Sequence, residues 1–134
     1  MGGKMKKLII VTLLILGNMA FADAQTCAVA YRYSQSPSEQ LVLSSQQSIA
    51  DLNDYRADRR TDWDNLISFV EVAPGCTLLA YQYQNFNRDN YSGRQLDGFV
   101  AIFDNNSWHQ RYRSYDLTGT AYNNSISSLK CFCR

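Results

Sequence analysis

An eight-residue pattern occurs twice in this chain, and it constrains the fold more than any other feature. Residues 63–70 and 122–129 both run through an aromatic residue, an acid or amide, an Asn, a variable position, an Ile and a Ser. A shorter Ala-Tyr-x-Tyr pattern recurs at 30–33 and 80–83. Two patterns that each occur once in the first half of the chain and again in the second indicate a duplicated supersecondary unit.

Alternating side chains predict β-strands in both halves. Large side chains stand at every second position in both halves: at Val29 and Tyr31 in the first, and at Leu79 and Tyr81 in the second. A period of two marks a strand with one face in a core. Short strands separated by Gly, Pro, Asn and Ser turns are typical of an antiparallel sandwich. The sequence therefore predicts an all-β domain, in which the polar segment 51–62 is a short helix or, with its many charges, an exposed loop.

The first 24 residues have the composition of a secretory signal peptide. Residues 1–7 hold three lysines and no acid, and residues 8–16 form a run of nine apolar or near-apolar side chains. Small residues around Ala22 and Ala24 provide a cleavage site. Because a spanning helix needs about 20 apolar residues, we expect a cleaved signal rather than a membrane anchor. The mature protein is then a single secreted domain over residues 25–134.

Charge and size exclude several classes of protein. The chain has 134 residues, with 13 basic and 12 acidic side chains. Removing the expected signal takes away three lysines and one aspartate, which leaves 10 basic and 11 acidic side chains. A nearly neutral domain is a poor candidate for a nucleic-acid partner, so we expect none.

The four cysteines predict two disulfides. Cys27, Cys76, Cys131 and Cys133 all lie beyond the signal, and an even number in a short secreted chain indicates a disulfide framework. A bond between Cys131 and Cys133 is disfavoured, because one intervening residue closes a strained ring. Cys27 and Cys76 are then each expected to pair with one member of the C-terminal pair, in an order that the sequence leaves open. A zinc site is the weaker alternative, because the chain has one histidine and no Cys-x-x-Cys pair.

No constellation of catalytic residues is visible. His109 is the only histidine, and no serine lies in a Gly-x-Ser-x-Gly context. Glu39 and Glu71 are the only glutamates, and a glycosidase pair would depend on a separation that sequence does not give. We therefore expect a protein that is not an enzyme.

Nine tyrosines are a large number for a domain of this size. We expect them to serve mainly as strand formers, with their rings in the core and their hydroxyls at its rim. The alternative is an exposed recognition surface, since arginines such as Arg88, Arg94, Arg111 and Arg113 are available to stack on aromatic rings.

The repeated turns resemble the calcium motif of the βγ-crystallin superfamily. In that family two acids or amides, two free positions, a Ser or Thr and a Ser occur once per Greek key. Residues 123–128 resemble this motif fully, and residues 64–69 resemble it with Phe69 in place of the last Ser. Residues 83–93 are similar to the aromatic, Gly-containing first hairpin of the same family. The resemblance implies a disulfide-stapled β-sandwich of two Greek keys.

The resemblance also implies a cofactor and its ligands. The first key would cover residues 27–74 and the second residues 75–134, and each Ca²⁺ would be shared between their turns. Ca²⁺ takes six to eight hard oxygens, but few charges surround these turns, so the sites should be weak. The alternative is a purely structural role, in which the polar side chains only stabilise the turns. The implied ligand residues are Asp64, Leu66 and Ser68 in the first turn, and Asn123, Ser125 and Ser127 in the second.

A narrower resemblance is to the syncollin family of secretory-granule proteins. Its features are residues 63–65 leading into 72–76, and the C-terminal residues 124–134. The resemblance implies a lumenal granule protein that acts in regulated exocytosis through association with granule membrane lipid, exocytic proteins or other cargo. A sandwich without an anchor would contact the membrane through a surface patch or by self-association. The alternative is a secreted defence or pore-forming module, since small crystallin-like proteins include both.

Overall fold

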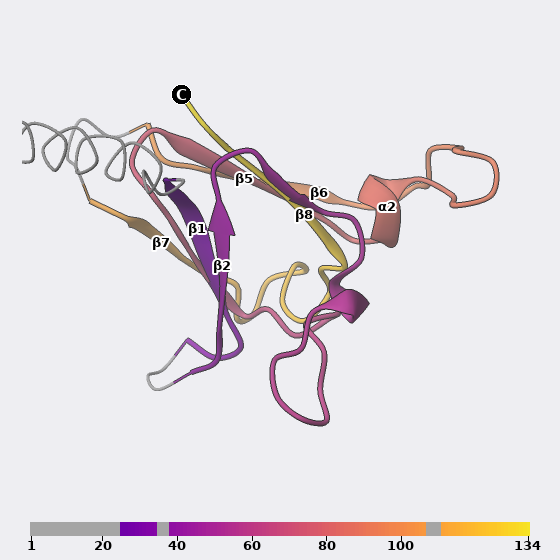
Figure 1. Cartoon of the computed structure of the whole chain (residues 1–134), viewed down its shortest axis with the longest axis horizontal. Coiled ribbons are helices and arrows are strands. Elements are labelled where there is room, and N and C mark those ends of the chain that lie inside the picture. The colour runs from indigo at the N-terminus through magenta and orange to yellow at the C-terminus, as the bar shows by residue number, and fades with distance from the viewer. Residues whose placement is uncertain (1–24, 35–37, 107–110) are drawn as a thin grey trace, which may run out of the picture.

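The computed structural model describes residues 25–34, 38–106 and 111–134, which form two four-stranded antiparallel sheets (Figure 1). The expected signal peptide lies outside the described residues, as does His109. One 3₁₀ turn, η1 (Leu52–Asp54), and one four-residue helix, α2 (Gln84–Asn87), accompany the strands. None of the described helices is long and apolar enough to cross a bilayer. The prediction of an all-β sandwich is confirmed.

Each sheet contains strands from both halves of the chain. Sheet A has the order β2 (Gln40–Ser44), β1 (Thr26–Tyr31), β4 (Phe69–Val72) and β7 (Arg113–Asp116). Sheet B has the order β3 (Gln47–Ile49), β8 (Ser128–Cys133), β5 (Cys76–Tyr81) and β6 (Val100–Asp104). All six pairings are antiparallel.

The strand orders reveal an approximate two-fold relation. Replacing β1–β4 by β5–β8 turns the order of sheet A into that of sheet B, taken from the opposite edge. The third strand of each half, β3 or β7, pairs in the sheet of the other half. This exchange is the Greek-key arrangement, and it is what a duplicated unit predicts.

Small side chains, rather than tyrosines, face the interior from the first strand. Ala28 and Ala30 are fully buried, whereas Tyr31 is half-buried on the outer face and Tyr33 is 54% exposed. Ala80 and Tyr81 repeat the arrangement on β5. The expectation that the tyrosine rings fill the core is therefore wrong for these strands. Alternation fixes which residues share a face, but not which face points inward.

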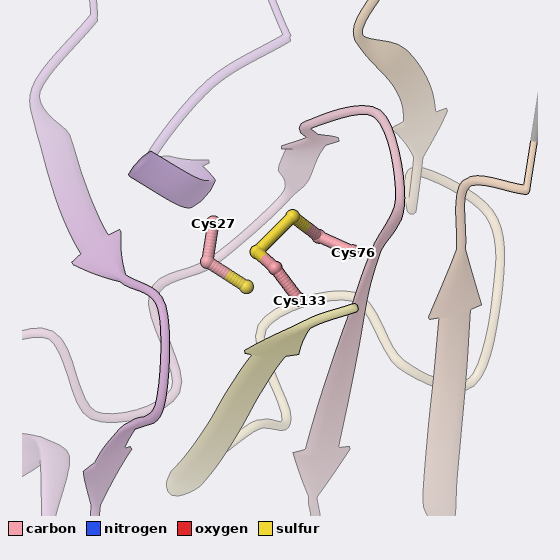
Figure 2. Close-up of side chains that lie close together, drawn as sticks. All are labelled: Cys27, Cys76 and Cys133. Carbon is pink, nitrogen blue, oxygen red and sulfur yellow. A yellow bond between two sulfur atoms is a disulfide. The ribbon is translucent and has the colours of Figure 1, made fainter. Parts of the chain in front are cut away.

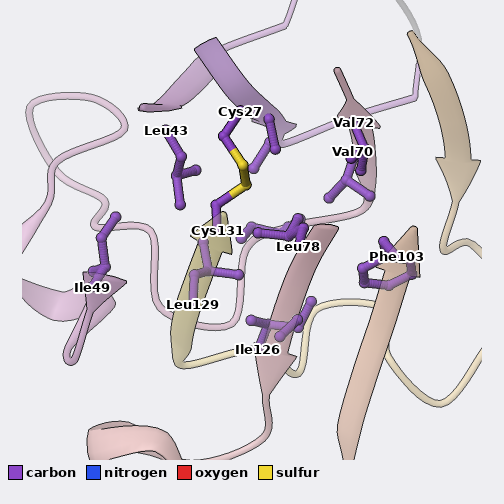
Figure 3. Packing of buried hydrophobic residues seen from close by; sticks show 14 of the residues in the cluster. Cys27, Leu43, Ile49, Val70, Val72, Leu78, Phe103, Ile126, Leu129 and Cys131 are labelled. Carbon is purple, nitrogen blue, oxygen red and sulfur yellow. A yellow bond between two sulfur atoms is a disulfide. The ribbon is translucent and has the colours of Figure 1, made fainter. Parts of the chain in front are cut away.

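The core between the sheets is built from branched aliphatic residues and a few aromatic ones (Figure 3). Trp63 and Leu52 from the connections add to the strand residues. The strand and turn residues in the cluster include Leu43, Ile49, Val70, Val72, Leu78, Phe103, Ile126 and Leu129.

Two disulfides hold the sandwich together, and they account for all four cysteines. Cys27–Cys131 joins β1 to β8, and so links sheet A to sheet B through the core (Figure 3). Cys76–Cys133 joins the neighbouring strands β5 and β8. The sulfur atoms of Cys27, Cys76 and Cys133 lie within 4.8 Å of one another (Figure 2). Each of the two earlier cysteines thus pairs with one of the C-terminal pair.

The polar segment 51–62 is ordered by its own side chains. The carboxylate of Asp51 caps η1 by accepting from the Asn53 N–H at 2.9 Å. An isolated β-bridge between Arg56 and Asp62 then closes a narrow loop. The segment thus combines the two predicted alternatives, a short helical turn and an exposed loop, and it buries Leu52 in the core.

We predict that the inter-sheet disulfide contributes a large share of the stability. It closes a sequence separation of 104 residues, and a native disulfide of a small secreted domain is worth about 2–5 kcal/mol. The double variant Cys27→Ser, Cys131→Ser should lose that amount of unfolding free energy in urea denaturation. A loss below about 0.5 kcal/mol would contradict this role.

Candidate functional site

The two repeated turns hold each other by reciprocal backbone hydrogen bonds. We call residues 63–68 and 122–127 the paired turns. The N–H of Asn65 donates to the carbonyl of Ile126 at 3.0 Å, and the N–H of Asn124 donates to the carbonyl of Ile67 at 3.0 Å. Both isoleucines are fully buried. Each half therefore satisfies the backbone of the other at its turn.

The serine that ends each turn is anchored on both sides. Its N–H donates to the last residue of the first strand in its own half, and its carbonyl accepts from a leucine N–H of the other half. These bonds are Ser68 to Tyr31 (3.0 Å), Ser127 to Tyr81 (2.9 Å), Leu117 to Ser68 (2.9 Å) and Leu52 to Ser127 (3.0 Å). The paired turns are thus fixed relative to both sheets.

An asparagine in the left-handed region shapes each turn. Asn65 has φ 57° and Asn124 has φ 54°, a conformation that asparagine tolerates better than most residues. Their side chains reach across to the opposite serine. The hydroxyl of Ser68 donates to Oδ1 of Asn124 at 3.0 Å, and that of Ser127 donates to Oδ1 of Asn65 at 3.4 Å.

One buried oxygen in each turn lacks a partner. Oδ1 of Asp64 and Oδ1 of Asn123 are inaccessible to solvent and have no hydrogen-bond partner. These two residues occupy equivalent positions in the repeated pattern. Burying a polar atom without a partner costs free energy, so the same deficiency at two equivalent positions marks both turns as candidates for ligation.

A pocket of about 290 Å³ opens beside the second turn. Its walls come from both turns and from the end of the β5 hairpin, and every lining side chain is uncharged. The lining residues are Asn65, Gln82, Tyr83, Asn124, Ser125 and Ser127. Hydroxyl, amide and carbonyl oxygens therefore line a small polar cavity.

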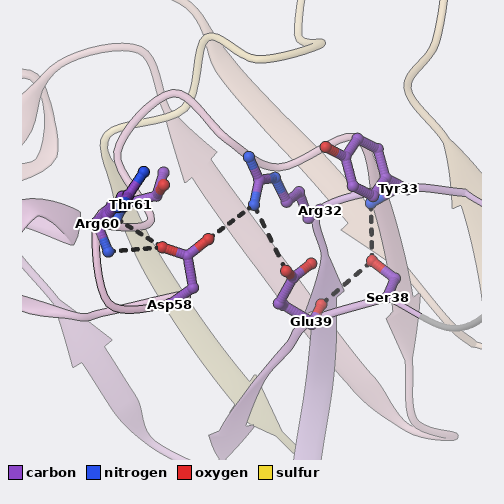
Figure 4. A network of polar contacts seen from close by, with 7 residues as sticks. All are labelled: Arg32, Tyr33, Ser38, Glu39, Asp58, Arg60 and Thr61. Atoms are coloured by element: carbon purple, nitrogen blue, oxygen red, sulfur yellow. Dashed lines mark hydrogen bonds and ion pairs between the residues drawn. The ribbon is translucent and has the colours of Figure 1, made fainter.

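The first half has an arginine at the position equivalent to Gln82. Arg32 lies between two carboxylates, with Nη1 at 3.0 Å from Asp58 and 3.5 Å from Glu39 (Figure 4). Backbone N–H donation from Arg60, together with bonds from Thr61 and Arg32, holds the pKa of Asp58 below its usual value. The guanidinium ties the β1 hairpin to the 51–62 segment, a link that has no counterpart at Gln82.

The position after each hydroxyl also differs between the halves. Ser128 is fully buried, and its hydroxyl donates to the Tyr83 carbonyl at 2.7 Å and accepts from the Phe86 N–H at 3.1 Å. Phe69 instead begins β4, and its ring lies edge-on to Tyr31. The first half thus has an aromatic ring at the start of β4 where the second half has a buried hydroxyl.

The structure places the expected ligand residues together in one region. Asp64, Leu66 and Ser68 lie on one turn, and Asn123, Ser125 and Ser127 lie on the other. The hydroxyl of Ser125 is turned back onto the Asn123 carbonyl at 3.0 Å. Asn65 and Asn124 were not among the predicted ligands, although both stand at the second acid or amide position of the repeated pattern. Gln82 and Tyr83 carry no such signal.

Comparison with known proteins identifies the fold. No protein-family model matches the chain, and no curated protein matches it by sequence. It is similar to a solved structure described by the words "Evolution of the eye lens beta-gamma-crystallin domain fold". The TM-score is 0.58 at 16% sequence identity, over 84% of this chain and 90% of that chain. The chain therefore has the βγ-crystallin domain fold.

We predict that the conformation of Asn65 is structurally required. A β-branched residue at positive φ is strained by about 1–3 kcal/mol, whereas glycine adopts this conformation freely. In urea denaturation, Asn65→Val should therefore lose about that much stability, and Asn65→Gly less than about 1 kcal/mol. Equal losses in the two variants would show that the backbone conformation is not what asparagine provides.

Proposed function

We propose that this protein is a secreted, non-enzymatic module that binds Ca²⁺ weakly at its paired turns. The main support is a pair of matching contacts, one in each direction between the two turns. Each turn presents a serine hydroxyl next to the amide oxygen of the other turn, and each holds a buried oxygen without a partner. An ion shared between the halves would use both features.

The oxygen spacing fits a calcium ion. Two ligands about 2.4 Å from one ion, at about 72–90° to each other, are separated by roughly 2.8–3.4 Å. The hydroxyl-to-amide distances are 3.0 Å for Ser68–Asn124 and 3.4 Å for Ser127–Asn65. Ser68 and Ser127, with Asn124 and Asn65 opposite them, would therefore hold an ion through side-chain oxygens, and the carbonyls of Leu66 and Ser125 would add backbone oxygens.

The charge of the turns sets the expected affinity. Asp64 is the single formal charge among the proposed ligand residues. Because Ca²⁺ affinity rises with ligand charge and rigidity, the sites belong with extracellular modules, at about 10⁻⁴ M, rather than with cytosolic buffers. Such sites would be filled only where Ca²⁺ is abundant, as outside the cell or in a storage granule.

Calorimetric titration with CaCl₂ tests the proposal. The protein with intact disulfides should give a saturable signal near 10⁻⁴ M, which Ser68→Ala and Ser127→Ala should each weaken. Ser48→Ala, which removes the hydroxyl of an exposed serine on β3, is the matched control and should titrate like the unaltered protein. Unchanged isotherms in both turn variants would remove the shared site and leave the side chains with a purely structural role.

We further propose that the protein works in the lumen of secretory granules, in contact with membrane lipid, exocytic proteins or other cargo. The supports are the two disulfides, which suit an oxidising compartment, the signal-like N-terminus and the syncollin resemblance. Localisation in a gland cell, with Ca²⁺-dependent association with phosphatidylcholine/phosphatidylserine vesicles, is the expected outcome. Dye release from those vesicles together with bacterial killing would favour the defence module instead.

A further inference from the structure

A second pocket, of about 280 Å³, lies on the outer face of sheet A, away from the paired turns. Its strand residues are Tyr31, Gln40, Phe69 and Glu71, and Tyr33 borders it beyond the end of β1. The volume is just below the usual range for small-molecule sites, about 300–1,000 Å³. A ligand here would be small.

Strand register builds an aromatic floor for this pocket. Tyr31 and Phe69 are directly paired across β1 and β4. Their rings meet edge to face, with centroids 5.6 Å apart and planes at 68°. Phe69 stands at the position that is equivalent to Ser128 in the other half. The first half therefore has an aromatic surface where the second half has a buried hydroxyl.

The same face carries carboxylates that no ion pair among the described residues balances. Glu71 follows Phe69 on the outer side of β4, and Asp116 on β7 is paired with Phe69. Among the described residues, the ion pairs found are those of Arg32 with Glu39 and Asp58, so Glu71 and Asp116 have none. The outward-facing positions of β2, β1, β4 and β7 hold no Lys or Arg.

Nearby basic groups are engaged elsewhere. The guanidinium of Arg32 lies 5.2 Å from the Tyr33 ring centroid and is neutralised by its two carboxylates. Arg113 stacks on Tyr115 at 5.1 Å, on the inner side of β7. Glu71 lines the pocket together with Tyr31 and Phe69. Burial, then the charge and hydrogen bonding of this carboxylate, raise the pKa of the Tyr31 phenol.

We propose that this pocket binds a small organic cation through an alkylammonium group. Aromatic faces attract ammonium groups, worth about 0.5–2 kcal/mol according to exposure, and Glu71 supplies the opposite charge. An anion would be repelled, and one carboxylate among rings is a poor set of ligands for a hard metal ion. The inference does not depend on calcium binding, since no proposed calcium ligand lines this pocket.

The isotopically labelled protein is titrated with choline chloride and, separately, with n-butylammonium chloride, which is a primary ammonium. Both titrations are monitored by two-dimensional NMR at constant ionic strength. At least one cation should cause saturable shifts of the Tyr31, Phe69 and Glu71 amides in the millimolar range. The two arms distinguish a quaternary from a primary ammonium as the preferred group. The neutral isostere 3,3-dimethyl-1-butanol should cause much smaller shifts, because it lacks the charge.

Variants locate the binding. Glu71→Gln should weaken the affinity at least about fivefold, and Phe69→Ser, which copies the other half, about three- to fivefold. Asp97→Asn removes the same charge from an exposed loop position and should change nothing. The proposal is overturned if neither cation gives saturable shifts, if the neutral alcohol binds as well as choline, or if Asp97→Asn weakens binding as much as Glu71→Gln. Retained dispersion of the amide spectrum shows that each variant is folded.

Discussion

Two backbone hydrogen bonds, from Asn65 to Ile126 and from Asn124 to Ile67, determine how the halves of this domain are assembled. They lie where each half of the chain leaves its turn, and their acceptors are the carbonyls of two fully buried isoleucines. Each of these N–H groups is thus satisfied by a carbonyl of the other half. The third strands, which pair in the opposite sheets, follow the same exchange, and the disulfide of Cys27 fixes the sheets to each other.

The repeated turns were predictable because their chemistry is local. Asn and Ser favour turns through hydrogen bonds to nearby backbone, so the recurrence of the pattern predicted a repeated unit. That the two turns meet was implied by the family resemblance. The inner face of β1 was not predictable, since alanines and tyrosines alternate and either set could face the core. The short strands β3 and β7 also gave no signal, because they are polar and their pairing is set by the other half.

The two halves share one arrangement of strands but carry different side chains. Position by position, Arg32 corresponds to Gln82 and Phe69 to Ser128, and these changes give each half a distinct surface. The second half presents an uncharged polar pocket beside the paired turns. The first half presents aromatic rings and a carboxylate on the outside of sheet A. One backbone plan thus supports two kinds of pocket, which sequence alone could not separate because the lining residues come from different strands.

We propose that the two turns together form an ion site that neither forms alone. A crystal structure grown with CaCl₂ and measured for anomalous scattering tests this most directly. We expect anomalous density within about 2.3–2.6 Å of a serine hydroxyl from one turn and an asparagine oxygen from the other, at Ser127 and Asn65 or at Ser68 and Asn124. Turns that keep their hydroxyl-to-amide contacts at saturating Ca²⁺, with no such density, would contradict it.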